Sequence, residues 1–252
     1  MIHFQALSKS YGAFDAVKPL TLTVPRGEVF GFLGPNGAGK TTTIRMMMGI
    51  LVPTAGRVTI GGLDCHTQRA QVQQRTGYLP DNPVYYDYLR GREILQFVAE
   101  MHGLPRPEAA ARARRGLEDW GLGDATDEFA VNYSMGMKKK LGLAIALMHE
   151  PEVLILDEPI NGLDPRAARE VQDRLKAIAG QGRTIFVSTH LLDMAERLCT
   201  RIGIIDRGQL VAAGTAAELR REGAGSESLE DIFLRMTQQP GQAAAGAERP
   251  AP

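Results

Sequence analysis

A glycine-rich loop around residue 38 has the composition and spacing to hold phosphate groups. The loop runs from Gly34 to Thr42 and fits the pattern G-x-x-x-x-G-K-[ST]. Its glycines let the backbone come close to a polyphosphate, and the positive end of a following helix favours a bound anion. We expect Lys40 to reach the β- and γ-phosphates of a nucleotide and the Thr41 hydroxyl to hold Mg²⁺. The residues expected to contact the nucleotide here are Gly34, Pro35, Asn36, Gly37, Ala38, Gly39, Lys40, Thr41 and Thr42.

The segments on either side of this loop support that interpretation. Residues 28–33 have the pattern of a short buried strand, and residues 42–48 have that of a helix. Strand, glycine loop and helix is the order that phosphate binding requires. The alternative is a glycine turn with an incidental lysine, which does not explain this context.

Two carboxylates follow an apolar strand predicted from Glu152 to Leu156. Such a run suits a strand that is buried on both faces of a parallel sheet, and the ligands of these sheets gather at the carboxyl ends of the strands. We expect Asp157 to support Mg²⁺ there and Glu158 to orient or deprotonate a water molecule. The alternative is a helix-capping pair, which the presence of a phosphate loop disfavours.

Three further side chains are candidates for the same site or a second one. His190 follows a predicted strand, Thr184 to Ser188, and a histidine is more often structural than catalytic, but this position favours a function. Tyr11 lies in a turn ahead of the loop, where it would stack on adenine or form a partly buried surface tyrosine. Ser134 is an expected N-cap beside Gly136, so the helix that follows offers a second anion site.

The composition limits the classes of protein to which the chain can belong. It has 252 residues, 44% of them apolar, and 29 basic against 29 acidic residues. We therefore expect a large core and no nucleic-acid partner. Cys65 and Cys199 lie far apart and are expected to be reduced thiols. We expect neither a signal peptide nor a membrane-spanning segment, because the apolar runs are far shorter than about 20 residues. A role at a membrane would then be peripheral.

The order of predicted elements changes character in the middle of the chain. From about residue 84 to residue 150 the pattern is mostly helical, and the three lysines at 138–140 are expected to form an ordinary polar helix face. A hairpin is predicted over residues 201–213 and a last amphipathic helix over residues 229–236. Residues 238–252 are rich in Ala, Gly, Pro and Gln, and we expect a flexible tail.

Taken together, these motifs resemble the ATP-binding subunit of an ABC transporter from about residue 2 to residue 236. Gly34 to Thr42 is similar to its Walker A motif, and Val153 to Glu158 is similar to Walker B with the catalytic glutamate. Tyr11 falls at the adenine-stacking position and His190 at the switch histidine. Asn161 to Asp164 resembles the D-loop.

Two departures narrow the resemblance. Tyr133 to Met137 lies where the signature Leu-Ser-Gly-Gly-Gln belongs, and it keeps Ser134 and Gly136 but has methionine at the third and fifth positions. Asp81 replaces the glutamine of the Gln-loop. A carboxylate there can bind a metal or its water, but it cannot donate the hydrogen bonds of an amide. Both departures are similar to the ATPases of ABC-2-type exporters.

The resemblance implies an α/β fold with a P-loop NTPase (RecA-like) core. Its sheet would be mostly parallel, with an N-terminal antiparallel β-subdomain and an inserted helical subdomain. One ATPase domain would span residues 1–237, with 1–83 and 151–237 as core and β-subdomain and 84–150 as helical subdomain. The implied cofactors are ATP and Mg²⁺, with Thr41, Asp157 and Asp81 as metal ligands.

The implied function is ATP hydrolysis that powers an exporter from the cytoplasmic face of the cell membrane. Ser134 and Gly136 would act on ATP bound by the opposite subunit of a homodimer, or of a pair with a homologous ATPase. A transmembrane permease would dock near Asp81 to Glu93, where Tyr85, Tyr86 and Tyr88 offer amphipathic contacts.

Two other functions fit the sequence less well. A soluble ABC-type ATPase of DNA repair or translation usually has tandem ATPase domains, long coiled coils or zinc inserts, and the sequence shows none of these patterns. A non-hydrolysing ATP-binding module is disfavoured because Glu158 and His190 are both present.

Overall fold

Two sheets and a group of helices make up the computed structural model, which describes residues 1–222 and 228–237. The strands are β1 (Ile2–Tyr11), β2 (Phe14–Val24), β3 (Val29–Leu33), β4 (Ala55–Ile60), β5 (Leu63–Asp64), β6 (Thr76–Leu79), β7 (Val153–Asp157), β8 (Thr184–Thr189), β9 (Arg201–Asp206) and β10 (Gln209–Gly214). The helices are α1 (Lys40–Met47), α2 (Arg69–Arg75), α3 (Gly91–Met101), α4 (Arg106–Asp119), α5 (Met135–Leu147), α6 (Pro165–Gly180), α7 (Leu192–Leu198), α8 (Ala216–Glu222) and α9 (Leu229–Thr237).

The central sheet has the strand order β10-β9-β3-β8-β7-β6. Its pairings are parallel except for the hairpin of β9 and β10. All residues of β3, β7 and β8 are buried, as expected for strands covered on both faces. Because these strands run in parallel, the phosphate loop after β3, the two carboxylates at the end of β7 and His190 after β8 meet at one edge of the sheet.

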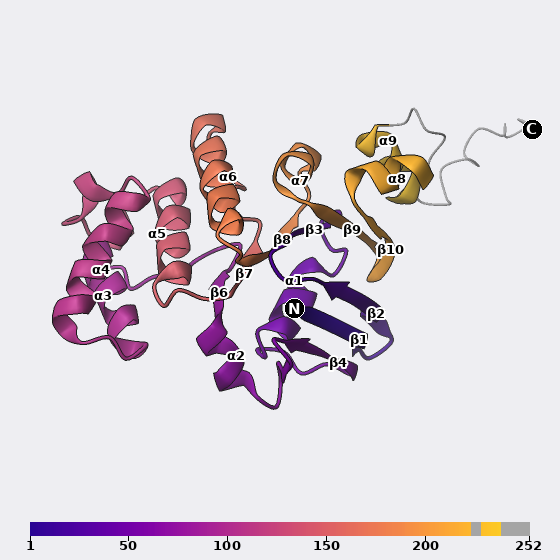
Figure 1. Ribbon diagram of the computed structural model, residues 1–252, viewed down its shortest axis with the longest axis horizontal. Helices are drawn as coiled ribbons and strands as arrows, with labels where there is room; N and C mark the ends of the chain where they lie inside the picture. Colours follow the sequence, from indigo (N-terminus) through magenta and orange to yellow (C-terminus); the bar gives the residue numbers. More distant parts are fainter. Residues whose placement is uncertain (223–227, 238–252) are drawn as a thin grey trace, which may run out of the picture.

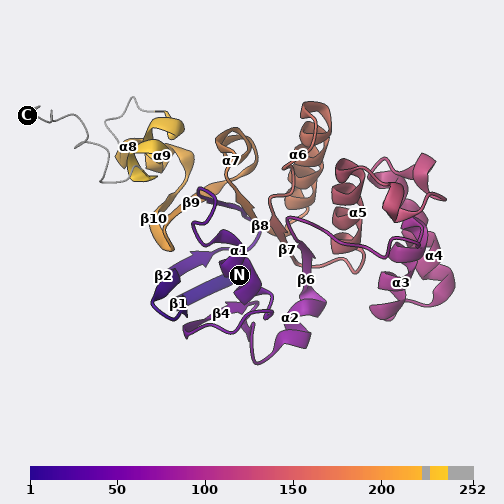
Figure 2. The same cartoon turned by 180° about the vertical axis from the view of Figure 1, so that it is seen from behind.

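Helices α6 and α7 lie on one side of this sheet and the second sheet with α1 on the other (Figure 1), and each side has its own hydrophobic core. One face carries Phe186, whose ring contacts those of Phe30 and Phe32, and this face packs against α1 and the second sheet. That second sheet is antiparallel, with the order β2-β1-β4-β5. The other face packs against α6 and α7, with Val171 and Leu175 of α6 buried. The view from behind shows the same arrangement (Figure 2).

Helices α3, α4 and α5 lie together at the β6 end of the central sheet (Figures 1 and 2). Helix α5 approaches β6 closely because each of the two elements places a glycine against the other. A Cβ atom on Gly77 would collide with the carbonyl of Ala146, and one on Gly142 would collide with Leu79. The second half of α5 therefore packs directly against β6.

The predicted fold class is confirmed, with a mostly parallel sheet, an antiparallel N-terminal sheet and inserted helices. The helix expected at residue 42 begins two residues earlier, at Lys40, and helices α2, α7 and α8 were not predicted. The division of the chain at residues 84 and 150 stays a prediction. The predicted tail at 238–252 lies outside the described residues. Within them, every helix is too short or too polar to cross a lipid bilayer.

Candidate active site

The phosphate loop has the backbone geometry that its glycines predict. Gly37 and Gly39 have φ angles of 82° and 104°, in the left-handed region that side chains other than glycine disfavour. A Cβ atom on Gly34 would strike the carbonyl of Ile205. Helix α1 begins directly after the loop, and its N-cap, Gly39, makes no side-chain capping bond. The first N–H groups of α1 therefore face the loop, where an anion would accept from them.

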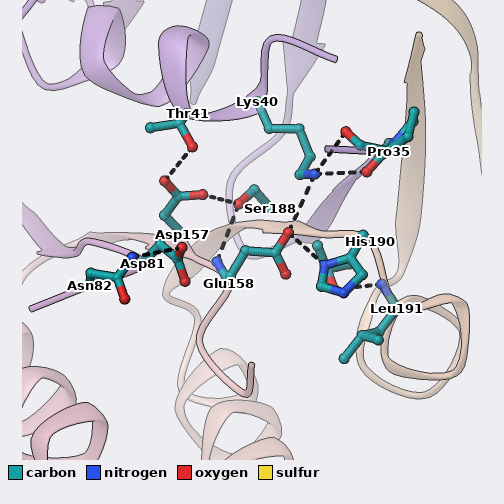
Figure 3. Close-up of polar contacts among 12 residues, drawn as sticks. Pro35, Lys40, Thr41, Asp81, Asn82, Asp157, Glu158, Ser188, His190 and Leu191 are labelled. Atoms are coloured by element: carbon teal, nitrogen blue, oxygen red, sulfur yellow. Dashed lines mark hydrogen bonds and ion pairs between the residues drawn. The ribbon is translucent and has the colours of Figure 1, made fainter. Parts of the chain in front are cut away.

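Lys40 is buried, and its ammonium group lies at the centre of the site. It donates to the carbonyls of Gly34 and Pro35 at 2.7 and 3.2 Å, and it lies 3.3 Å from Oε1 of Glu158. Figure 3 shows the side chain reaching between the loop and this carboxylate. An ammonium has three donors, and three oxygens lie around this one.

Asp157 connects the end of β7 with both the loop and β8. Its Oδ2 accepts from Thr41 Oγ1 at 2.9 Å, and its Oδ1 accepts from the hydroxyl of Ser188, its cross-strand neighbour (Figure 3). Burial raises the pKa of Asp157, while the hydrogen bonds from Ser188 and Thr41 act in the opposite direction. A hydroxyl and a carboxylate at this distance are a donor set that suits Mg²⁺.

In the described part of the chain, no group of three or more His, Cys, Asp or Glu side chains is arranged to hold a metal ion by itself. This does not conflict with Mg²⁺ at Thr41 and Asp157. Magnesium usually takes one or two protein ligands and completes its shell with substrate phosphates and water.

Glu158 has an unusual backbone conformation, with a φ of 49°. Its N–H donates to the Ser188 carbonyl at 3.1 Å. Its side chain is buried, and Oε1 lies 3.0 Å from Nδ1 of His190, a contact that is attractive when that nitrogen carries a proton (Figure 3). A non-glycine residue in this region costs about 1–3 kcal/mol and persists only where its surroundings hold it.

Lys40, Thr41 and Glu158 border one cavity of about 340 Å³, whereas Asp157 and His190 are not part of its lining. Tyr11 lies at its rim and is 52% exposed, with the ammonium of Lys9 5.1 Å from its ring centre. Phe14 was not predicted as part of the site, but it also lines the cavity and is 64% exposed. The expected residues that line the cavity are Tyr11, Asn36, Gly37, Gly39, Lys40, Thr41, Thr42, Asp81 and Glu158.

The expected anion site at the start of α5 is separate from this cavity. Ser134 is the N-cap and accepts from the N–H of Met137 at 3.2 Å. Neither Ser134 nor Gly136 lines the cavity. Gly136 instead lies beside the loop after β7, where a Cβ on it would be 3.3 Å from Leu163. Met135 is 48% exposed, so this turn of α5 faces outward.

The expectation that residues 138–140 form an ordinary polar face is wrong for Lys139, which is only 1% exposed. Its ammonium donates to the Glu158 carbonyl at 2.6 Å and to Asp81 Oδ1 at 3.3 Å. Burial lowers the pKa of Lys139, and the charge of Asp81 opposes that shift. A signal existed in the sequence, because Leu143 and Ala146 follow Lys139 at helical spacing and both are buried.

The expected docking tyrosines are not equivalent. Tyr86 and Tyr88 are 69% and 82% exposed, as contacts for a partner would be. Tyr85 points inward and donates to the Lys138 carbonyl at 2.8 Å, and burial raises the pKa of its hydroxyl. The expectation that Tyr85 offers a surface contact is therefore wrong, because this side chain connects the segment after β6 to α5 through a hydrogen bond.

Comparison with known proteins places this geometry in a family. The family model for "ABC transporter" matches residues 17–161. A daunorubicin resistance ATP-binding protein of Streptomyces coeruleorubidus is 41% identical over 237 residues, which are 94% of this chain and 74% of that protein. A linearmycin resistance ATP-binding protein of Bacillus subtilis is 38% identical over 219 residues, 87% of this chain and 70% of that protein. A solved structure of the ATP-binding subunit of an ABC transporter superposes with a TM-score of 0.86 at 32% identity, covering 94% of this chain and 99% of that one.

Proposed function

The chain belongs to the ABC transporter family as an ATP-hydrolysing subunit, and we propose how its residues perform this role. The observation that carries the proposal is the cluster at the sheet edge. There Lys40 faces Glu158 at 3.3 Å, Thr41 faces Asp157 at 2.9 Å, and Glu158 faces His190 at 3.0 Å. A phosphate loop, a magnesium ligand pair and a water-orienting carboxylate are the parts that phosphoryl transfer to water requires.

ATP binds with its phosphates on the loop N–H groups and Lys40. Since Lys40 pairs with Glu158, the phosphates compete with that carboxylate for the same cation. Thr41 and Asp157 would hold Mg²⁺, which would neutralise phosphate charge, and Asp81, which lines the same cavity, would be a further candidate ligand for the metal or its water.

Glu158 orients or deprotonates the attacking water, and His190 contacts the γ-phosphate. Oε1 of Glu158 and Nδ1 of His190 are buried, and among the described residues they are at ion-pair distance without a well-aligned hydrogen bond. Such atoms remain available to a water molecule or a phosphate oxygen.

Each complete site contains two subunits, either identical or homologous. Tyr11 stacks on adenine at the rim, and Ser134 and Gly136 act on ATP held by the opposite copy. The position of these two residues outside their own cavity supports this arrangement. The N-terminus of α5 then supplies partial positive charge to the partner's γ-phosphate.

The partner in the membrane is a permease, and the subunit lies on the cytoplasmic face of the membrane. The exposed Tyr86 and Tyr88 belong to the proposed docking segment, Asp81 to Glu93. The names of the relatives concern resistance to daunorubicin and linearmycin, which favours an exporter of antibiotic-like molecules over an ATPase of DNA repair or translation.

Isolation of the native complex from membranes tests this proposal. We expect a permease to co-purify with the chain and an ATPase activity that Lys40→Ala abolishes. Recovery of the intact chain only with ribosomes or nucleic acid would refute the transport role.

The two-subunit site has its own test. A Glu158→Gln variant is expected to sediment as a dimer in saturating Mg·ATP, and Ser134→Arg in that background is expected to prevent the dimer while ATP still binds. A Glu158→Gln variant that stays monomeric would rule out the shared site.

A further inference from the structure

Lys139 is a buried cation that the motifs described above do not use. It lies in the second turn of α5, and its ammonium is directed away from solvent, with 1% of the residue exposed. Both of its hydrogen-bond partners belong to other parts of the site. One is the main-chain carbonyl of Glu158 at 2.6 Å, and the other is the carboxylate of Asp81 at 3.3 Å. Burying a charge is costly unless it is paired, so these contacts must compensate for lost hydration.

Lys139 contacts Glu158 at a point where the backbone conformation is unfavourable. The φ angle of 49° places this residue in a sparsely populated region. Its N–H is held by Ser188, and its carbonyl accepts from Lys139 and from the N–H of Asn161 at 3.2 Å. Since the direction of the Glu158 side chain follows from this backbone conformation, Lys139 helps to set where the carboxylate points.

The contact with Asp81 balances the charge of Lys139. Asp81 stands beside two other carboxylates, and its charge contributes to raising the pKa of Asp157. An amide at position 81 would accept a hydrogen bond from Lys139 but would leave its charge unpaired. The Asp81 carboxylate is 36% exposed, so water reaches one side of the pair.

We propose that Lys139 is a positioning residue for ATP hydrolysis, which holds the backbone of Glu158, and that Asp81 acts as its counter-ion. The inference rests on the proposed function, because it assumes that Glu158 orients the attacking water. It assigns the carboxylate of Asp81 to Lys139, in place of the metal ligation proposed above. Helix α5 then joins Ser134, which faces the opposite subunit, to the Glu158 of its own chain.

A double-mutant cycle on the full-length chain tests this role. The variants are Lys139→Met, Asp81→Asn and the combination, with steady-state ATPase kinetics and thermal unfolding measured for each. Lys138→Met is the matched control, because it removes the neighbouring lysine charge from the same helix, and within the described residues this side chain makes no hydrogen bond or ion pair.

We expect Lys139→Met to lower kcat about 100-fold, since a misplacement of about 1 Å has that effect, while the KM for Mg·ATP changes little. Lys138→Met keeps the wild-type kcat. Asp81→Asn lowers kcat about tenfold in the wild-type background and has no further effect once Lys139 is methionine, because a counter-ion matters only while its cation is present. If Lys139 had only a structural role, Lys139→Met would lower the unfolding temperature but would not lower kcat selectively while leaving KM unchanged.

Several outcomes would overturn the inference. A wild-type kcat for folded Lys139→Met would show that Glu158 does not depend on it. Independent, multiplying effects of the two substitutions, with a raised Mg²⁺ requirement for Asp81→Asn, would make Asp81 a metal ligand instead. If Lys139→Met does not fold, Asp81→Asn alone decides, by whether kcat or the Mg²⁺ requirement changes. Failure of the proposed function differs from all of these, because wild type would then hydrolyse ATP no faster than Lys40→Ala.

Discussion

Replacement of Glu158 by glutamine should affect ATP binding and hydrolysis in opposite directions. The carboxylate lies 3.3 Å from the ammonium of Lys40, and both side chains are less than 10% exposed. Two unit charges 3.3 Å apart attract by about 5 kcal/mol at an effective dielectric constant of about 20. An incoming phosphate must displace this carboxylate from Lys40 and then remain close to its negative charge.

The substitution changes the dissociation constant for ATP by less than this, because the bound phosphates replace most of the attraction that Lys40 loses. We expect Glu158→Gln to bind ATP about 10- to 100-fold more tightly, equivalent to about 1.4–2.8 kcal/mol. Turnover should be lost, since an amide cannot take a proton from water. Without nucleotide the variant should unfold at a lower temperature than wild type, because Lys40 loses its buried counter-ion.

Fluorescence titration with ATP and thermal unfolding, each with and without nucleotide, measure both effects. Glu118→Gln, an exposed glutamate on α4, is the control and should behave as wild type. Glu158→Gln that binds ATP no more tightly than wild type would refute the competition between carboxylate and phosphate for Lys40.

Three other predictions concern the metal, the pH and the packing. Thr41→Val removes a proposed Mg²⁺ ligand and should raise the Mg²⁺ concentration for half-maximal ATPase activity about tenfold, measured by Mg²⁺ titration. Burial lowers the pKa of His149 to about 4, so as the pH falls the unfolded chain takes up a proton on this ring before the folded chain does. Stability is then complete above about pH 6.5 and falls by about 1–2 kcal/mol toward pH 4, after allowance for the partial exposure of the ring. Urea unfolding at pH 7.5 and 4.5 measures this loss, and His149→Phe should reduce it. Gly77→Ala drives a Cβ into the Ala146 carbonyl and should destabilise by about 1–3 kcal/mol in urea unfolding, whereas Gly180→Ala, with open space around it, should not.

The sheet edge could be predicted because each part of it has a strong local signal. The phosphate loop has glycines at fixed offsets, and β7 is an unbroken apolar run that ends at Asp157 and Glu158. Parallel pairing then brings the ends of β3, β7 and β8 together without further information. Ser188 could have been found by the same reasoning, because it lies at the register position opposite Asp157.

The features that were not predicted depend on packing between distant segments. Helix α2 buries only Val72, so it has no apolar stripe for a sequence pattern to detect. Lys139 sits in a run of three lysines that is typical of a solvated face, and its burial depends on Asp81, 58 residues earlier, and on Glu158, 19 residues later. The helical spacing of Lys139 with Leu143 and Ala146 indicates a core position, but only its distant partners explain why a charge is buried there.

The two buried lysines hold different ends of Glu158, and this division suits a residue that must orient water. Lys40 comes from the phosphate loop and pairs with the carboxylate, whereas Lys139 comes from α5 and binds the main-chain carbonyl. Phosphates that bind Lys40 would release the carboxylate toward water and His190, while Lys139 keeps the backbone in its left-handed conformation. The position of the Glu158 side chain then depends on whether nucleotide is bound, whereas its backbone conformation depends on the contact with α5. Substitutions of the two lysines should therefore have different kinetic effects. A substitution of Lys40 should lower both ATP affinity and turnover, whereas a substitution of Lys139 should lower turnover alone.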